Sequence, residues 1–411
     1  MAKADDYVVG IDIGSSKVLV LVARRDGRGG LEIAGRGQAP NRGTRRGSIV
    51  NLEATLEALK AATEEAEVMA GTEIGRAYVG VAGADVRCVN VRGKIDIARK
   101  DREITKADVQ RVLEVAQAAP IPSEREILHA VAQEFIVDEQ GGIADPVGMM
   151  GSKLEVLVHL VSTQRARSKT ILTCVNRTGI EVEELVFEPL ATAEVVLTPD
   201  ERDLGALLVD VGAGTTAYAL FAEGVVQHSG VLPIGGGHFT NDLAVVLRTP
   251  HPEAERLKIA SGCCLESMLG DEQEVAVPGV AGAGTRYVPK REICEILQPR
   301  AEELLQLLRE ELKVQGWDGH LRGGVVLTGG GAQLEGLPEL AGQLLGTTVR
   351  LGTPTGLGGL MDGLAQPSAA TAAGLLRYGL QAEMLQPRRA RRGFSFAGVV
   401  GTLRNVFSDL L

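Results

Sequence analysis

Apolar and polar residues alternate in the first part of the chain in a way that predicts three strands. Residues 7–13 and 16–24 lie on either side of the turn "GSS", and a third strand is expected at residues 31–38. Residues 204–230 repeat the same order of strand, glycine-rich turn, strand, turn and strand. An internal repeat of this kind predicts two similar halves that face each other.

Helical periodicity and a change of character mark the segments between and after the repeats. Residues 51–71 begin with an asparagine start signal, carry apolar residues at helical spacing and end at a glycine, so they predict a helix. Residues 85–163 combine a basic strand pair, a helix and further strands, which indicates an inserted α+β subdomain. Helices are expected to dominate residues 237–264 and 290–315, with a glycine-rich segment between them.

These patterns predict an α/β protein of two halves, each of which carries an additional subdomain. The length of 411 residues also favours more than one domain, because a single hydrophobic core rarely grows that large. The expected divisions are residues 1–84 with 164–198 for the first half, 85–163 for its inserted subdomain, 199–229 with 320–380 for the second half, 230–319 for its smaller part, 381–393 for a linker and 394–411 for a C-terminal helix.

The predicted C-terminal helix is amphipathic. It is too polar to span a bilayer, but a helix with one apolar face can lie in the membrane interface. The arginines just before it would each contribute about 1 kcal/mol of attraction to anionic lipid. The alternative is a helix that docks on its own domain or in a partner groove. The apolar residues are Phe396, Val399, Val400, Leu403, Val406, Phe407, Leu410 and Leu411, and the arginines are Arg388, Arg389, Arg391 and Arg392.

Composition narrows the class of protein. The formal net charge of −10 argues against nonspecific nucleic-acid binding, which needs a basic face. The five cysteines form no C-x-x-C pair, so structural thiols in a reducing cytoplasm are expected. Residues 1–7 are polar and the first apolar run is interrupted by charge, so the sequence predicts neither a signal peptide nor a membrane-spanning helix.

Each repeat has an aspartate at the end of its first strand, followed by a turn of glycine and hydroxyl residues. Backbone N–H groups in two such facing turns can bind a triphosphate, and the two aspartates could hold Mg²⁺ through water. One such turn alone is common in hairpins; the recurrence favours phosphate binding. The first turn provides Asp12, Gly14, Ser15, Ser16 and Lys17, and the second provides Asp210, Gly212, Gly214, Thr215 and Thr216.

Five stretches carry a family resemblance. "GIDIGSSK", "FEPLATAEVVL", "LLVDVGAGTTAYALF", "GVVLTGGGAQLEGL" and "SAATAAGLLRYGL" resemble, in that order, the phosphate, connecting and adenosine motifs of the actin, Hsp70 and sugar-kinase superfamily. Within it the chain is similar to the FtsA family of bacterial cell-division proteins, because of the insertion at residues 85–163, the stretch "RLKIASGCCLESM" and the short amphipathic helix after a linker.

The resemblance implies an actin-like (ribonuclease H-like) duplicated fold, with ATP or ADP and Mg²⁺ in a cleft between the halves. The two turns would bind the β and γ phosphates, while Gly329, Gly330 and Gly331 would approach the adenosine. Glu255 and Lys258 would face the ribose and adenine; a solvated ion pair one helical turn apart is the alternative.

Glu188 falls where related filament proteins orient the attacking water. A carboxylate at a helix N-terminus is also favoured by the helix dipole alone, so a purely structural role is equally open. The resemblance implies at most a weak ATPase whose nucleotide state controls assembly.

The resemblance also implies partners and a location. Arg300, with Lys290 and Arg291 nearby, would bind the acidic C-terminal peptide of FtsZ, the tubulin-like division protein. The chain would polymerise with itself in an actin-like way, attach to anionic lipid at the inner face of the cell membrane at the division site, and contact other division proteins through the inserted subdomain.

Two other functions fit the same fold. A sugar or acetate kinase would need a base deep in the cleft, and the sequence offers none besides Glu188. A pilus-assembly protein is also actin-like, but the linker and helix at residues 381–411 suit a direct membrane anchor better.

Overall fold

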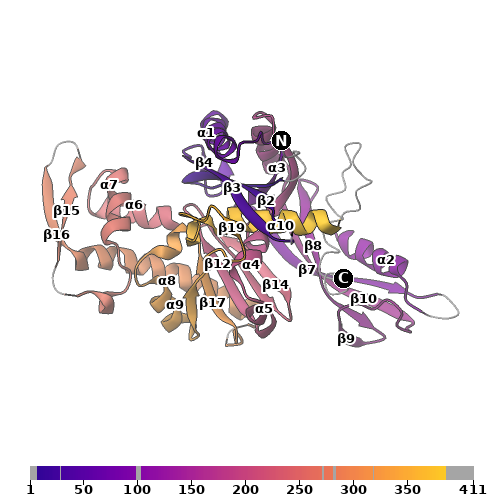
Figure 1. Cartoon of the computed structure of the whole chain (residues 1–411). Coiled ribbons are helices and arrows are strands. Elements are labelled where there is room, and N and C mark those ends of the chain that lie inside the picture. The colour runs from indigo at the N-terminus through magenta and orange to yellow at the C-terminus, as the bar shows by residue number, and fades with distance from the viewer. Residues whose placement is uncertain are drawn as a thin grey trace.

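The first half is built on a mixed sheet of six strands (Figure 1). In the computed structural model, residues 7–27, 29–98, 103–270, 273–280, 284–317 and 319–385 are described. The predicted C-terminal helix, its four arginines and most of the predicted linker lie outside these residues. The sheet order is β11-β6-β1-β2-β3-β19, with β1 at Tyr7–Ile13, β2 at Lys17–Arg25, β3 at Leu31–Pro40, β6 at Arg76–Val81, β11 at Glu181–Phe187 and β19 at Gly358–Gly359.

The second half repeats this plan in a sheet of five strands. Strands β12 and β13 form an antiparallel hairpin as β1 and β2 do, and β12 pairs in parallel with β17 as β1 pairs with β6. The internal repeat predicted from the sequence is therefore confirmed. The order is β14-β13-β12-β17-β18, with β12 at Ala206–Val211, β13 at Thr216–Ala222, β14 at Val225–Leu232, β17 at Gly324–Thr328 and β18 at Val349–Leu351.

Helix α1 (Leu52–Ala70) covers the outer face of the first sheet together with α3 (Arg165–Asn176). As predicted, Asn51 caps α1 by accepting a hydrogen bond from the Ala54 N–H, and Gly71 ends it in the left-handed conformation. The apolar face of α1 packs on the strands through Leu56, Leu59 and neighbouring alanines.

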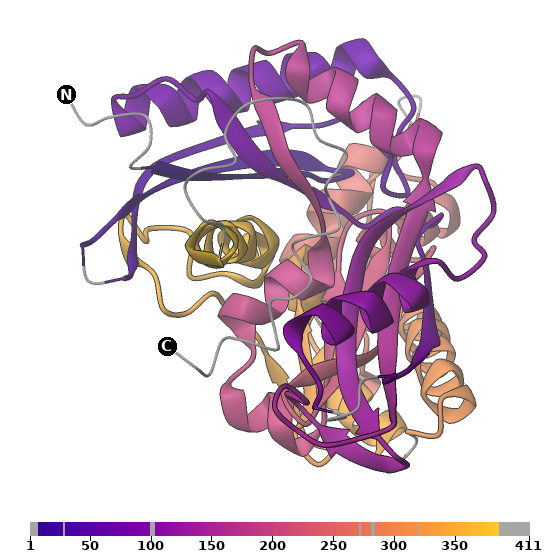
Figure 2. The same ribbon diagram turned by 90° about the vertical axis from the view of Figure 1, so that its right-hand side faces the viewer.

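Two helices lie between the halves. Helices α4 (Glu188–Val196) and α10 (Ala370–Leu385) pack against each other, and their small side chains share one core with strands of both sheets. Figure 2 shows α10 end-on beneath the first sheet. A Cβ atom on Gly374 would lie 2.2 Å from the carbonyl oxygen of Ala191, so the two backbones are as close as glycine allows.

The predicted start of the C-terminal linker is too early. The linker was expected from residue 381, but the helix continues to Leu385. Side chains of the last turn have partners in the first half: Gln381 donates to Glu194, and Glu383 forms an ion pair with Arg25. Ala382 is also buried, so these contacts hold the helix beyond its small-residue stretch.

The inserted subdomain has a core of its own and projects from one end of the molecule (Figure 1). Its sheet has the order β7-β10-β8-β9, and one helix packs against it, as the sequence predicted. The elements are β7 at Arg87–Asp96, α2 at Lys106–Gln117, β8 at Arg125–Val137, β9 at Gln140–Ile143 and β10 at Lys153–Gln164.

The smaller part of the second half forms the opposite end (Figure 1). Its expected first helical region divides at residues 247–250 into two helices, because Arg248 has a left-handed backbone (φ 47°) and Pro250 precedes the next helix. The glycine-rich segment before α8 contains a hairpin that the sequence did not predict. The elements are α6 at Gly236–Val246, α7 at His251–Ser261, β15 at Glu274–Pro278, β16 at Thr285–Pro289 and α8 at Lys290–Val314.

Short elements complete the described chain. Among its helices, none is both long and apolar enough to cross a membrane. The remaining elements are β4 at Thr44–Arg45, β5 at Ser48–Ile49, α5 at Pro199–Leu204, α9 at Leu337–Leu345 and the 3₁₀ turns η2 at Glu266–Met268, η4 at Gly330–Gln333 and η5 at Pro367–Ala369.

Candidate functional site

The two halves enclose a cleft of about 1240 Å³. The β1–β2 turn and the β12–β13 turn both line it, so the repeat brings together the two segments that the sequence singled out. Of the residues predicted for this site, those that line the cleft are Asp12, Gly14, Ser15, Ser16, Lys17, Glu188, Asp210, Gly212, Gly214, Thr215, Glu255, Lys258, Gly329, Gly330 and Gly331.

Thr216 is the exception. It is fully buried as the first residue of β13, and its hydroxyl donates to the carbonyl oxygen of Ile234 at 2.8 Å. Successive residues of a strand point to opposite faces, so Thr215 and Thr216 cannot both face the cleft. The hydroxyl of Thr216 therefore does not face the cleft and instead ties β13 to the segment just after β14, while a phosphate contact through the Thr216 backbone N–H stays a prediction.

The two turns touch across the cleft. A Cβ atom on Gly214 would lie 2.5 Å from Ser15 Oγ, so only glycine fits between the turns there. The hydroxyl of Thr215 donates to the carbonyl oxygen of Ala82 at 3.2 Å, which joins the second turn to the first half. Backbone donors and hydroxyls from both halves therefore converge on one end of the cleft.

Three carboxyl groups gather at the same end. Asp12 lies one residue before the end of β1, Asp210 lies one residue before the end of β12, and Glu188 begins α4; all three line the cleft. Asp210 Oδ2 accepts a hydrogen bond of 2.9 Å from the hydroxyl of Thr371 on α10. Parallel strands and helix N-termini meet at this edge of the two sheets, which explains why these residues converge.

Burial dominates the electrostatics of this group. It raises the pKa of Asp12 to about 6, which Lys17 opposes and Asp210 reinforces. Burial likewise raises the pKa of Asp210 to about 6, against the effects of the Thr371 hydrogen bond and Lys17. Burial, and then the charges of Asp12 and Asp210, raise the pKa of Glu188 well above its usual range. A cation placed among these groups would keep them ionised.

We expect Asp210→Asn to become more stable relative to the wild-type protein as the pH rises from about 4 to about 7, without metal or nucleotide. The folded-state pKa of Asp210 is raised from 3.8 to about 6. Protonation of Asp210 therefore stabilises the fold below pH 3.8, and this contribution is lost as the pH rises through 6. Asparagine stays neutral, so the difference in unfolding free energy should grow by up to about 3 kcal/mol.

Thermal unfolding of both proteins across this pH range measures that difference. The Asp200→Asn variant is the control, because Asp200 is an exposed aspartate in the first turn of α5. A difference between Asp210→Asn and wild type that stays constant with pH would contradict the electrostatic account.

Glycines and a lysine form a further part of the cleft wall. Gly329 has φ 84°, and a Cβ atom there would lie 2.2 Å from Asp210 Oδ1, so this approach needs glycine. Lys258 Nζ lies 2.8 Å from Glu255 Oε2, 2.9 Å from Thr240 Oγ1 and 3.0 Å from the carbonyl oxygen of Gly236. Glu255 and Lys258 thus form the ion pair of the alternative interpretation and also line the cleft.

Sequence reasoning missed part of the lining. The β4–β5 hairpin contributes Arg42, Arg45 and Arg46, and its Gly47 N–H donates to Ser15 Oγ at 3.2 Å. The basic, glycine-bounded stretch "NRGTRRG" directly after β3 was a usable signal. No sequence signal indicated Thr371, because it lies within a helix of small residues and meets Asp210 only through the tertiary fold.

The three residues predicted to bind a partner peptide lie on α8 and do not line the cleft, and each has an internal partner. Arg300 Nε and Nη2 bind the two carboxylate oxygens of Asp242 at 2.7 and 3.1 Å, and Arg300 also pairs with Glu303. The other pairs, at 2.9 and 3.0 Å, are Lys290 with Glu335 and Arg291 with Glu266.

Two protein-family models match parts of this chain. The family described as "Cell division protein FtsA" matches residues 207–374, and the "SHS2 domain inserted in FTSA" matches residues 83–162. The latter range coincides with the inserted subdomain. Among solved structures, that of the "PilM-PilN type IV pilus biogenesis complex" is similar with a TM-score of 0.66 at 17% identity, covering 91% of this chain and 98% of that one.

The structure of MreB5 of Spiroplasma citri bound to ADP is similar with a TM-score of 0.55 at 15% identity, covering 90% of this chain and 95% of that one. These structures show an actin-like fold. The Cell division protein FtsA of Pseudomonas aeruginosa is 42% identical over 91% of this chain and 89% of its own length. That of Escherichia coli is 37% identical over 93% of both chains. The chain therefore belongs to the FtsA family of cell-division proteins.

Proposed function

We propose that the protein binds ATP or ADP with Mg²⁺ in the cleft and uses the nucleotide state to control its assembly. The observation that carries this is the meeting of two duplicated turns, Lys17 and three buried carboxyl groups at one end of the cleft. Backbone N–H groups and a lysine suit phosphate, and the carboxylates suit a cation. The similar MreB5 structures, bound to ADP and to AMPPNP, support the same occupant.

We propose that Mg²⁺ is held by Asp12 and Asp210 through water. Within the described residues, no group of three or more histidine, cysteine, aspartate or glutamate side chains is arranged to hold a metal directly. Mg²⁺ commonly keeps several waters and uses one or two carboxylates with substrate phosphates, which suits this pair. The ion would neutralise phosphate charge, and Lys17 would contribute a second positive charge.

We propose that turnover is slow. Glu188 lies beside Asp12 and Asp210 in the described lining of the cleft, where it would orient the attacking water. Burial and the charges of Asp12 and Asp210 raise the pKa of Glu188, and a bound cation would oppose this shift. A weak ATPase coupled to assembly fits membership of the FtsA family better than a metabolic kinase or a pilus-assembly protein does.

We propose that the C-terminal segment attaches the protein to the inner face of the cell membrane at the division site. The support is the apolar periodicity of residues 394–411 and the four arginines before them. The FtsZ C-terminal peptide would bind near Arg300, whose bidentate pair with Asp242 shows that its guanidinium is oriented for carboxylates. Such a peptide would replace Asp242 or Glu303 on Arg300. Head-to-tail self-assembly and contacts with other division proteins complete the proposal.

Co-sedimentation with anionic vesicles tests the membrane anchor. The full chain with ATP should sediment with vesicles, and a chain without residues 394–411 should remain in solution. Phe407→Glu, on the apolar face, should weaken binding about tenfold or more, whereas Ser408→Glu on the polar face should have little effect. A full chain that stays in solution with ATP and anionic lipid would contradict the anchor.

A further inference from the structure

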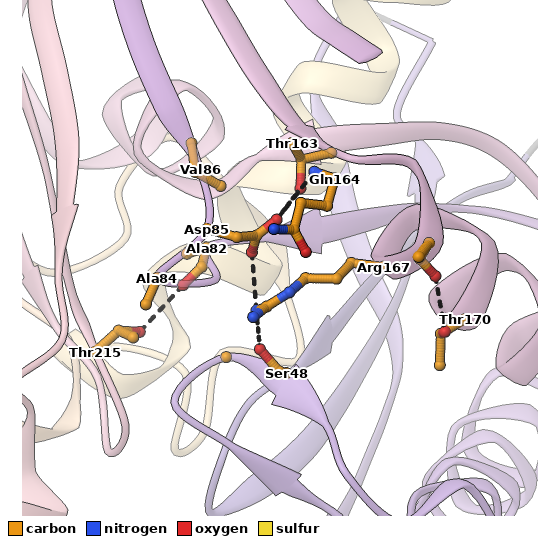
Figure 3. A network of polar contacts seen from close by, with 12 residues as sticks. Ser48, Ala82, Ala84, Asp85, Val86, Thr163, Gln164, Arg167, Thr170 and Thr215 are labelled. Atoms are coloured by element: carbon orange, nitrogen blue, oxygen red, sulfur yellow. Dashed lines mark hydrogen bonds and ion pairs between the residues drawn. The ribbon is translucent and has the colours of Figure 1, made fainter. Parts of the chain in front are cut away.

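The inserted subdomain joins the first half at a small polar junction, here called the root, which consists of residues 82–86 and 163–167. Asp85 is buried in it, accepts two hydrogen bonds and forms one ion pair (Figure 3). The donors of the hydrogen bonds are Thr163 Oγ1 at 2.7 Å and the Gln164 N–H at 3.0 Å, and the ion pair joins Asp85 to Arg167 Nη1 at 2.9 Å. Arg125 of the subdomain also donates to the Asp85 carbonyl oxygen at 2.8 Å. Asp85 thus fastens the chain segment that enters the subdomain to the one that leaves it.

The root contacts the second phosphate turn directly and reaches the first through the β4–β5 hairpin. Thr215 of the second turn donates its hydroxyl proton to the carbonyl oxygen of Ala82 at 3.2 Å. Arg167 donates to Ser48 Oγ in the β4–β5 hairpin, and the neighbouring Gly47 N–H donates to Ser15 Oγ of the first turn. Figure 3 shows the bond between Thr215 and Ala82 beside the contacts of Asp85, Arg167 and Ser48. The backbone of residues 82–85 joins these two groups of contacts.

The two hydroxyls differ in what they can do when a phosphate arrives. Ser15 Oγ accepts from Gly47, so its own proton is free for a phosphate oxygen without loss of that bond. Thr215 has one hydroxyl proton, which it already donates to Ala82. A phosphate oxygen within reach of Thr215 therefore competes directly with the Ala82 carbonyl. Since Ala82 is buried, loss of this donor favours a rearrangement of the root.

The far side of the subdomain is tied to the second half. His159 Nε2 lies 2.7 Å from Ser229 Oγ on β14, and Asn90 and Gln133 donate to the Gln227 carbonyl oxygen, both at 2.9 Å. The subdomain thus contacts both halves of the cleft. A change at its root alters its position relative to β14 and to the rest of the second half.

We propose that Thr215, Asp85 and Arg167 couple the γ-phosphate in the cleft to the orientation of the inserted subdomain. This rests on the proposed nucleotide binding. With a γ-phosphate, Thr215 donates to the nucleotide and releases Ala82; with ADP, Thr215 keeps Ala82 and the root stays closed. Asp85 and Arg167 are positioning residues that pass this change to the strands of the subdomain. By linkage, a protein that binds the subdomain changes the preference for ATP over ADP by the same factor.

Hydrogen exchange of the full-length protein tests the coupling with Mg²⁺–AMPPNP and Mg²⁺–ADP. The probes are the Gln164 N–H, which donates to Asp85, and the Val86 N–H, which donates to the Gly83 carbonyl oxygen. Both should exchange about fivefold faster with AMPPNP than with ADP. Thr215→Val removes the donor at similar shape and should abolish the difference, while Thr215→Ser should restore it.

Calorimetry of nucleotide binding distinguishes failure of the proposed nucleotide binding from failure of the coupling. If the wild-type protein binds neither nucleotide, the proposed function fails. If the wild-type protein binds both nucleotides and the root amides exchange at the same rate with AMPPNP and with ADP, the coupling alone is overturned. The coupling is also overturned if Thr215→Val keeps the difference in exchange rate between the two nucleotides. Arg167→Met is a second variant should Thr215→Val not fold, and it should also reduce the difference. Arg177→Met is its control, because Arg177 caps the same helix and pairs with the exposed Glu53.

Discussion

An Asp210→Asn variant is expected to bind Mg²⁺–ATP about 10- to 100-fold more weakly than the wild-type protein, the range for loss of an outer-shell metal partner. Asparagine preserves the shape of the side chain and can still accept the hydrogen bond from Thr371. What it removes is the negative charge beside Asp12 that a hydrated cation requires. Isothermal titration calorimetry with and without Mg²⁺ measures the loss, which should be much smaller when Mg²⁺ is absent.

The fold provides an internal control for this variant. Burial disfavours the charged form of Asp210, so Asp210→Asn should unfold at or above the wild-type temperature when no ligand is present. Mg²⁺–ATP should raise the unfolding temperature of the wild-type protein but raise that of the variant much less. Unchanged affinity in Asp210→Asn would remove Asp210 from the proposed metal site.

A Gly374→Ala variant is expected to lose about 3 kcal/mol of folding stability, at the upper end of the usual cost of overpacking. The added Cβ would lie 2.2 Å from the Ala191 carbonyl oxygen and 2.5 Å from its carbon, and backbone atoms cannot turn aside as a flexible side chain can. Helices α4 and α10 would have to separate, which disturbs the core that both sheets share. Chemical and thermal unfolding measure the change.

Gly342→Ala is the matched control, because Gly342 lies within α9 and its added Cβ would meet the Thr347 carbonyl oxygen at an ordinary 3.5 Å. Alanine should stabilise this helix by up to about 1 kcal/mol, through its higher helix propensity. If Gly374→Ala proved as stable as Gly342→Ala, the close approach of α4 and α10 would be wrong.

Local signals account for what the sequence predicted correctly. The β1–β2 and β12–β13 hairpins, the capped helix α1 and the inserted subdomain all follow from periodicity and turn chemistry within short windows. Strand alternation would also have excluded the Thr216 hydroxyl from the cleft, since its neighbour Thr215 faces it. The motif alone does not distinguish these two side chains.

Other features depend on contacts between distant segments. Asp12, Glu188 and Asp210 converge because the two sheets and α4 meet at one edge. No local sequence pattern encodes this convergence or the raised pKa values that follow from it. The extension of α10 to Leu385 depends on Arg25 and Glu194 in the first half. The internal pairs of Arg300 likewise involve Asp242, which lies on a separate helix.

The position of the inserted subdomain has a consequence for how freely this part of the chain can change. Its two ends meet at Asp85, which receives a hydrogen bond from Gln164 across the junction. The root therefore holds the two ends of the inserted chain together. Each doubling of a flexible loop costs only about 0.6 kcal/mol in closure entropy. Longer loops in the parts of the subdomain that contact neither the root nor β14 would therefore change the folding free energy little, whereas changes at Asn90, Gln133 or His159 would break its contacts with the second half.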